Sequence, residues 1–387
     1  MKRITDIMTS IIKYEICENN ASFALSFAIS QEDAQKLYIL SKKHDVAHIV
    51  GNFLLKNKVL LPDEVKKAFE KYTFQALRHH ELLNFELQNV CDILDELKIN
   101  HIPLKGSVIR NIYPESWLRS SCDIDILVPE KDAEKVVEHL IEEHNFKKKA
   151  ENTHDISTFS PRGICVEIHY ALVEDGIANE SSNILKSVWN YCTPKNESEY
   201  RLFMTDEMLY FYHIAHMAKH FENGGCGVRP FLDLFLLDRL ENADKQKRDK
   251  LLEKGGLLKF ADSARNLSQI WFGNETRNEI SLMFEEFIIR GGSFGNNTNR
   301  VNVQQRKKGG RIAYALSKIF TPYERLKHHY PIIKKHKWLT PIMQVRRWGK
   351  LIFCGHAKRS VNELKYSSNI SATEAETMKN FLSNIGL

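Results

Sequence analysis

The chain has 387 residues, of which 43% are hydrophobic and 27% are charged, and its formal net charge is +6. This composition is ordinary for a globular protein and argues against a long disordered chain. Charged residues interrupt the first segment where a signal peptide has a continuous apolar run, and no apolar stretch is long enough to cross a bilayer. We therefore expect a cytoplasmic protein without a membrane span, with two or three domains or one elaborated core.

Residues 1–99 are predicted to form an N-terminal helical region. Its clearest pattern lies at residues 75–98, where apolar side chains recur at helical spacing and form one stripe. An earlier helix is expected to begin at Pro62, where the missing N–H of proline costs little. Nothing in this region indicates chemistry.

Residues 100–192 predict a small α/β core. The expected elements, in chain order, are a strand at 102–104, one or two helical turns at 107–113, a strand at 123–128, a helix at 131–144, and strands at 156–159 and 164–169. Gly106 breaks the first strand, and the sequence Pro161-Arg162-Gly163 suits the last turn. This order indicates a small mixed sheet with helices packed on it. The predicted fold class is therefore α+β, with helical regions before and after the sheet.

Two further regions complete the predicted organisation. Residues 193–290 are expected to form a helical substrate- or nucleotide-binding region, with helices at 205–221, 228–240, 257–271 and 279–289. Residues 291–387 are expected to form a basic helical region, because residues 300–359 hold sixteen Lys and Arg against one acid. Aromatic residues are interleaved with these basic residues, which suits contact with nucleic acid. A solvated basic helical surface is the alternative.

Two carboxylates lie two residues apart in the strand predicted at 123–128. Because side chains alternate along a strand, Asp123 and Asp125 lie on one face and Ile124 lies on the other. Like charges that close are costly unless a cation neutralises them. Glu167 lies between Val166 and Ile168 in a later strand, and such an acid needs a partner. These three acids are therefore candidate ligands of divalent metal, and Mg²⁺ prefers such oxygen ligands.

The turn before these acids suits a phosphate. Gly106 lets the backbone approach a phosphate closely, and Ser107 begins a short helix whose N-terminus favours anions. Lys105 and Arg119 add positive charge against a triphosphate. A second Gly-Ser pair occurs at Gly292-Ser293, but no strand with paired acids follows it. The conjunction of turn and acids thus predicts a nucleotide site at the first pair only.

These residues together resemble the polymerase-β-like nucleotidyltransferase superfamily, whose pattern is a Gly-Ser turn, an acid-x-acid strand and a later strand acid. More narrowly, the chain resembles the bacterial family of uncharacterised nucleotidyltransferases. The features that carry this likeness are Leu104-Lys105-Gly106, Arg119 before Asp123-Ile124-Asp125, and Glu167-Ile168-His169. The separation between Ser107 and Asp123 is longer than in many members of the superfamily.

The resemblance implies a reaction and a division of roles. Asp123 and Asp125 would hold two Mg²⁺, and Glu167 would bind the catalytic ion and help to deprotonate the acceptor. An NTP would then transfer its NMP to a hydroxyl group and release pyrophosphate. The acceptor, whether a small molecule, RNA or protein, is left open. Two alternatives are an RNA- or protein-modifying toxin or regulator with the same chemistry, and a degenerate nucleotide-binding interaction module.

Several other residues are candidates for the wall of the cleft. His213, His216 and His220 lie in one predicted helix, and His216 and His220 share a face of it. One interpretation is a Zn²⁺ site that includes a distant acid such as Asp233; the other is a polar lining of the nucleotide or acceptor cleft. The resemblance includes a histidine-rich helix followed by Arg and Asp, which Arg229 and Asp233 match loosely. His169 is a further candidate, either for contact with phosphate or acceptor or as a partner of a carboxylate.

Overall fold

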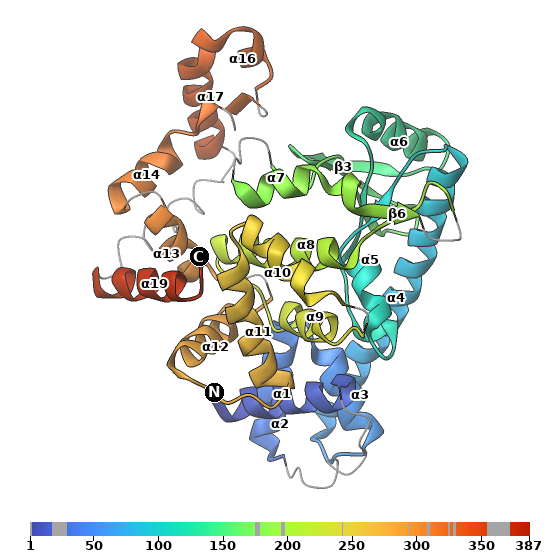
Figure 1. The fold of residues 1–387 in the computed structure, drawn as a ribbon, viewed down its shortest axis with the longest axis vertical. Helices are drawn as coiled ribbons and strands as arrows, with labels where there is room; N and C mark the ends of the chain where they lie inside the picture. Colours follow the sequence, from blue (N-terminus) through green and yellow to red (C-terminus); the bar gives the residue numbers. More distant parts are fainter. Residues whose placement is uncertain are drawn as a thin grey trace.

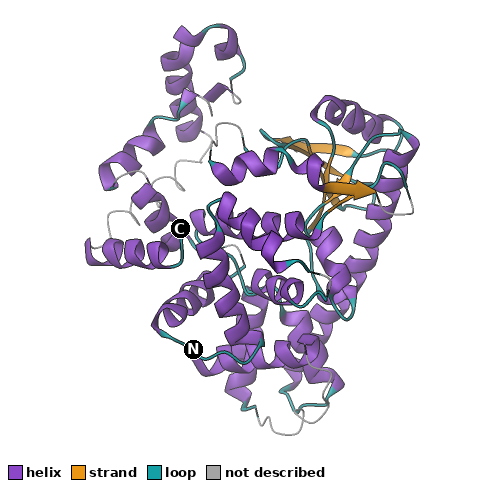
Figure 2. Cartoon of the chain, in the orientation of Figure 1, coloured by secondary structure: helices purple, strands orange, loops and turns teal. Residues whose placement is uncertain are grey.

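The computed structural model describes residues 2–17, 29–174, 179–194, 198–241, 243–293, 295–307, 310–323, 326–327, 330–353 and 372–387. Part of the predicted basic segment, including residues 354–371, therefore lies outside the described residues. Helices flank a small five-stranded sheet and a two-stranded sheet in this structure (Figures 1 and 2). The α+β fold class is thereby confirmed. Within the ranges above, no helix combines the length and the apolar character that a bilayer crossing requires.

The N-terminal region is helical, as predicted. Its elements are α1 (Lys2–Ile12), a short π-helix (Lys13–Cys17), α2 (Gln31–Lys43), α3 (Ala47–Lys56) and α4 (Asp63–Glu96). The sequence predicted two separate helices after Pro62, whereas the structure has one helix of 34 residues. The two predicted helices are continuous because no glycine or proline interrupts residues 63–96.

The sheet has five strands in the order β1-β2-β5-β4-β3. Their bounds are β1 (Ile102–Pro103), β2 (Asp123–Leu127), β3 (Lys147–Glu151), β4 (Asp155–Phe159) and β5 (Cys165–His169). The central pair, β2 and β5, is parallel, and the other neighbouring pairs are antiparallel. The mixed sheet predicted from the sequence is confirmed, although β3 was not expected.

One face of the sheet is apolar and is covered by helices. Ile124 and Ile126 of β2 and Val166 and Ile168 of β5 are buried in one cluster with side chains of α4 and of α6 (Glu130–Glu142). Both helices lie beside the sheet, and α4 continues beyond it to pack against α3 (Figure 1). Burial of one face turns the alternate residues of each strand to the other face, where the polar side chains gather.

The chain after the sheet is again mostly helical. Its elements are α7 (Glu180–Lys186), strands β6 (Cys192–Pro194) and β7 (Leu202–Met204), α8 (Asp206–Glu222), α9 (Arg229–Asp238), α10 (Lys245–Lys254), α11 (Leu258–Phe272) and α12 (Glu279–Gly291). The helices predicted in this region are confirmed within a few residues; α7, α10, β6 and β7 were missed. A second core joins α8, α9, α11 and α12 to the N-terminal helices, and includes Met8, Val50, Phe211, Phe231 and Phe284.

The basic C-terminal part is also helical where it is described. Its helices are α13 (Asn297–Lys307), α14 (Arg311–Ile319), α16 (Ile332–Lys335), α17 (Thr340–Phe353) and α19 (Ala372–Asn384). Helices α14, α16 and α17 extend away from the sheet and the two cores (Figure 1). A small cluster of Leu326, Ile333 and Met343 holds α16 and α17 together.

Candidate functional site

The turn between β1 and β2 brings a lysine to the polar face of the sheet. The backbone of Lys105 has φ 46°, a conformation that a non-glycine residue seldom adopts. Gly106 begins a single helical turn, α5 (Gly106–Ile109), and a Cβ atom there would collide with Ser121 Oγ and the Arg119 guanidinium. The turn therefore requires glycine because side chains pack against its backbone. Ser107 is buried and lies outside the cavity described below.

The three predicted acids lie together on the parallel pair of strands. Asp125 of β2 is directly opposite Glu167 of β5, and Asp123 lies two residues earlier on the same face of β2. Lys105 Nζ donates a hydrogen bond to Asp125 Oδ1 at 2.7 Å. His169 Nε2 lies 2.8 Å from the same oxygen and 3.6 Å from Glu167 Oε2. The structure thus assembles side chains that are far apart in the sequence into one polar cluster.

The two aspartates have opposite electrostatic environments. Burial and the neighbouring Asp125 carboxylate raise the pKa of Asp123 to about 6. Burial would also raise the pKa of Asp125, but Lys105 and His169 hold it well below its usual range. Burial would lower the pKa of the Lys105 ammonium, but the Asp125 carboxylate raises it above its usual value. Asp125 is therefore an ionised, fully partnered carboxylate, whereas Asp123 has an uncompensated charge at neutral pH.

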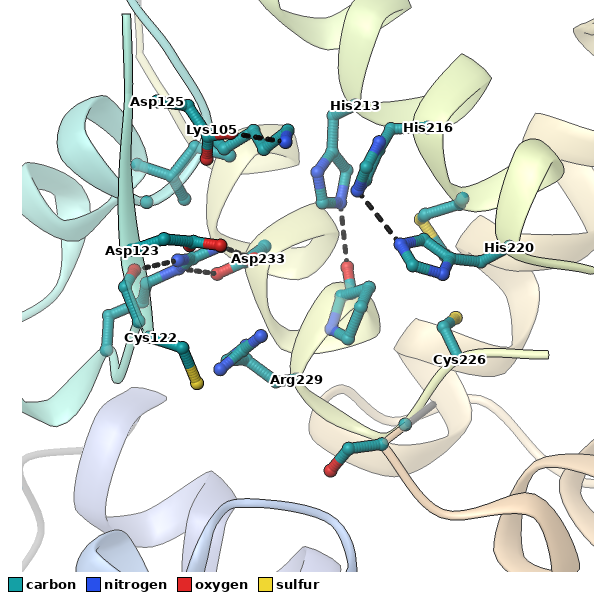
Figure 3. A pocket seen from close by; sticks show the side chains of 18 of the residues that line it. Lys105, Cys122, Asp123, Asp125, His213, His216, His220, Cys226, Arg229 and Asp233 are labelled. Atoms are coloured by element: carbon teal, nitrogen blue, oxygen red, sulfur yellow. Dashed lines mark hydrogen bonds and ion pairs between the residues drawn. The ribbon is translucent and has the colours of Figure 1, made fainter. Parts of the chain in front are cut away.

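A cavity of about 290 Å³ opens beside the acids. Asp123, Asp125 and Lys105 lie on one side of it, and the histidines of α8 lie on the other (Figure 3). Of the predicted site residues, those that line it are Lys105, Gly106, Arg119, Asp123, Asp125, His213, His216, His220, Arg229 and Asp233. Glu167 and His169 lie outside this lining. His169 instead lines an adjoining cavity of about 160 Å³, which shares Lys105, Tyr212 and His216 with the first.

Arg119 is bound within the protein by a buried acid. Its Nη2 and Nε atoms donate to the two carboxylate oxygens of Asp233 at 2.9 and 3.2 Å. Tyr113 Oη donates to the same carboxylate at 2.7 Å, and Arg119 Nη1 donates to Ser121 Oγ at 2.9 Å. Burial would raise the pKa of Asp233, but Arg119 holds it below its usual value. The pair therefore fixes α9 to the chain segment that precedes β2.

Arg229 ties the start of α9 to the N-terminal helices. Its Nη1 atom donates to Asp45 Oδ2 at 2.8 Å and to the Ser120 backbone oxygen at 2.9 Å. Asp45 lies between α2 and α3, so one guanidinium connects three parts of the chain that are distant in the sequence. The side chain also lines the cavity, where it lies beside Cys122 (Figure 3).

The histidines of α8 make short contacts and are held neutral. His213 Nε2 lies 2.8 Å from the Pro230 backbone oxygen, and the Nε2 atoms of His216 and His220 are 2.9 Å apart. Burial lowers the pKa of His220 to about 4 and the pKa of His216 well below its usual value. Among the described residues, the groups with three ligand atoms close enough for one ion contain none of these histidines. A polar wall of the cavity fits the structure better than the Zn²⁺ interpretation.

Sequence reasoning missed several residues of the cavity. His44, between α2 and α3, and Cys226, before α9, both line it. Ser293 also lines it, although its Gly-Ser pair was set aside in the sequence; its backbone N–H and its hydroxyl both donate to the Lys43 backbone oxygen. Tyr212 lies between the two cavities, and burial raises the pKa of its hydroxyl. No local motif distinguishes these residues, because tertiary contacts alone bring them to the site.

Comparison with known proteins identifies the family. A family model described as uncharacterised nucleotidyltransferase matches residues 30–273, well over half of the chain. The chain therefore belongs to this family. No curated protein and no solved structure matches it. The matched segment includes the turn at Gly106, all three acids of the polar cluster, and the helices α8 and α9 that form the opposite wall.

Proposed function

We propose that this protein is a Mg²⁺-dependent nucleotidyltransferase of the polymerase-β-like superfamily, which transfers NMP from an NTP to a hydroxyl acceptor. The observation that carries the proposal is the group of three carboxylates on a parallel strand pair, next to a glycine turn and a cavity. Membership of a nucleotidyltransferase family supports the same reaction class. The net reaction forms a bond between the acceptor oxygen and the α-phosphorus and breaks the bond from that phosphorus to pyrophosphate.

The residues present fit a divalent cation. Ligand atoms of Asp125, Glu167 and His169 lie within 4.8 Å of one another. In the described part of the chain, the Asp123 carboxylate has no hydrogen bond or ion pair, and burial together with the Asp125 carboxylate raises its pKa. Carboxylate oxygens are the ligands that Mg²⁺ prefers. Asp123 and Asp125 would hold two ions and Glu167 would bind one of them, as the resemblance implies.

Each side chain then has a role that its position supports. Mg²⁺ bound there would neutralise charge on the phosphates and lower the pKa of the acceptor hydroxyl. Glu167 would accept the proton of that hydroxyl, because its carboxylate is partly exposed and has only long contacts, with Ser157 Oγ at 3.5 Å and His169 Nε2 at 3.6 Å. Lys105 would exchange its contact with Asp125 for a phosphate oxygen. Arg229 is paired with Asp45 through Nη1, but its Nε atom has no hydrogen-bond partner among the described residues and would be available to the nucleotide.

Arg119 and Ser107 take less direct roles in this proposal. Because Asp233 already neutralises the Arg119 guanidinium, Arg119 would support the Gly106 turn from behind. Ser107 Oγ is buried without a hydrogen-bond partner among the described residues, so its hydroxyl is available to the turn or to a ligand. The histidines of α8 would line the nucleotide side of the cleft as neutral groups.

The acceptor defines the second candidate function, an RNA- or protein-modifying enzyme. The surface of α16 and α17 favours RNA over a small molecule, since it combines basic side chains with an exposed Trp338. Arg346 and Lys350 both lie near the ring of Tyr330 on this surface. Such a mixture of basic and aromatic groups can bind phosphates and stack on bases.

The proposal is tested by incubating the full chain with labelled NTPs, Mg²⁺ and cell extract. We expect label to enter an acceptor, and RNase or protease treatment then identifies its class. The double variant Asp123→Asn/Asp125→Asn should abolish labelling while far-UV circular dichroism stays unchanged. Equal labelling by wild type and double variant would show that the three-acid site does not transfer nucleotides.

A further inference from the structure

A second group of metal-ligand side chains lies beside the three acids on the same polar face of the sheet. It consists of His154, Asp155 and His169, whose ligand atoms lie within 4.8 Å of one another. Asp155 of β4 is directly opposite His169 of β5, on the side of β5 away from β2. The position of His154 is fixed as well, because its backbone oxygen accepts hydrogen bonds from the Tyr170 and Ala171 N–H groups.

His169 has one ring nitrogen in use and one without a partner. Its Nε2 atom bonds Asp125 Oδ1 at 2.8 Å. Its Nδ1 atom is buried and has no hydrogen-bond partner among the described residues, in a side chain that is only 5% exposed. In many metal sites a ligating imidazole donates its other N–H to a carboxylate, which fixes the tautomer and the ring orientation. His169 and Asp125 have this arrangement, and Nδ1 is left for a ligand.

The other two side chains already have nearly the spacing that a small ion requires. His154 Nε2 lies 3.3 Å from Asp155 Oδ2. Two ligands at about 2.0–2.1 Å from a tetrahedral Zn²⁺ lie about 3.3 Å from each other. The opposite oxygen, Asp155 Oδ1, accepts from Asn152 Nδ2 at 2.9 Å and from Ser157 Oγ at 3.4 Å. The carboxylate is therefore oriented by one oxygen and leaves the other to His154.

The group also has access from solvent. His154 and His169 both line the smaller cavity of about 160 Å³, so an ion can reach them without passing through the nucleotide cavity. Asp155 itself is buried, with 3% of its surface exposed. A divalent cation bound there would compensate the charge of this buried carboxylate.

We propose that His154, Asp155 and His169 form a second metal site, specific for a Zn²⁺-type ion and distinct from the site of the three acids. Two nitrogens and one oxygen suit Zn²⁺ or Co²⁺, whereas Mg²⁺ prefers oxygen ligands alone. Three protein ligands leave a fourth position for a water or substrate atom at the smaller cavity. The two sites are linked through His169, which bonds Asp125 on one side and binds the ion on the other. This inference does not require that the protein transfer nucleotides.

The test is Co²⁺ and Zn²⁺ binding by the chelator-treated full chain in a large excess of Mg²⁺. We expect one Co²⁺ per chain with the visible absorption of a tetrahedral site, and displacement of that Co²⁺ by one Zn²⁺. His154→Gln should weaken binding about 100-fold or more, since even partners that only orient a ligand contribute about 10–100-fold. Asp155→Asn should do the same while it keeps the bonds to Asn152 and Ser157.

Two controls separate this site from its neighbour and from surface histidines. His139→Gln removes a histidine of α6 whose ring lies against that of His144, and it should leave Zn²⁺ affinity unchanged. Asp123→Asn damages the three-acid site and should also leave it unchanged. The inference is overturned if both His154→Gln and Asp155→Asn bind Zn²⁺ as tightly as wild type. It is equally overturned if excess Mg²⁺ or Asp123→Asn removes the bound Zn²⁺, because the ion then belongs to the three acids.

Discussion

The two sides of the larger cavity differ in whether their charged side chains are neutralised by a neighbouring side chain. On the strand side, Asp123 and Asp125 line the cavity beside one lysine, and Glu167 lies next to Asp125 outside the lining; Asp123 has no hydrogen-bond or ion-pair partner within the described chain. On the helix side, Arg119 is paired with Asp233, Arg229 is paired with Asp45, and the histidines are neutral. A carboxylate without a counter-charge can bind an external cation, whereas a buried ion pair stabilises the contact between the segments that it joins. The difference predicts that damage on the strand side abolishes chemistry and damage on the helix side abolishes stability.

The largest effect is expected from Glu167→Gln. The amide keeps the shape of the side chain but cannot accept a proton from the acceptor. We expect the transfer rate to fall about 100- to 10,000-fold, the range typical for loss of a general base. Single-turnover kinetics with the labelled NTP measures it, and urea unfolding provides the control. If Glu167→Gln lowers the free energy of unfolding strongly and the transfer rate only slightly, the strand side is structural rather than catalytic.

On the helix side, Asp233→Asn should destabilise the protein by about 3–5 kcal/mol, because it leaves a buried guanidinium without its counter-charge. Urea denaturation followed by tryptophan fluorescence measures the change. The matched control is Arg119→Met/Asp233→Leu, which removes both charges and should recover most of the stability. If Asp233→Asn is as stable as wild type, the buried pair does not hold α9 in place.

The unpaired Asp123 should make the metal-free protein sensitive to pH. Its pKa is about 6 in the folded chain against 3.8 for the ordinary group. Between these values the native state keeps a proton that the unfolded state loses, so the free energy of unfolding falls as pH rises through this window. Above pH 6 the cost is on the order of 1–2 kcal/mol after allowance for solvent screening. In EDTA at pH 7.5, Asp123→Asn should therefore be more stable than wild type.

Added Mg²⁺ should restore the stability of wild type at pH 7.5 and leave Asp123→Asn nearly unaffected. Thermal unfolding scans with and without the ion measure both changes. The variant should also have a flatter stability profile between pH 4 and pH 6. Parallel profiles for wild type and Asp123→Asn would mean that the Asp123 carboxylate is already neutralised within the protein.

The smallest effect is expected from His220→Gln on the helix side. The pKa of His220 is about 4, so the imidazole is neutral throughout the range in which the enzyme would work. Glutamine removes one neutral contact with His216, which costs about 0.5–1.5 kcal/mol of stability. The pH profile of transfer between pH 5 and 8 should be unchanged. A shifted profile would show that this imidazole titrates during the reaction.

The strand side was largely predictable from the sequence, because alternation within a strand is a local rule. Asp123 and Asp125 share a face for that reason, and Glu167 projects away from its apolar neighbours for the same reason. The sequence could not show that Lys105 bonds Asp125, since the bond depends on how the turn folds back over β2. The site roles themselves remain predictions.

The helix side was less predictable, because its contacts join residues more than a hundred positions apart. Arg119 meets Asp233 across 114 residues, and Arg229 meets Asp45 across 184. No sequence pattern near these residues predicts either ion pair. Strand β3 was missed for a different reason: its sequence Lys-Lys-Lys-Ala-Glu is exposed throughout and shows no apolar alternation.

The exposed strand β3 also disfavours pairing of this sheet with a strand of another chain. β3 forms one edge, and its three lysines would repel a second copy of the same edge laid against it. At the other edge, beside β1, His101 forms a backbone bridge with Arg201, and β1 also lies against β7. Neither edge offers a long apolar template to another chain. Aggregation by addition of a strand from another chain is therefore disfavoured at both edges of this sheet.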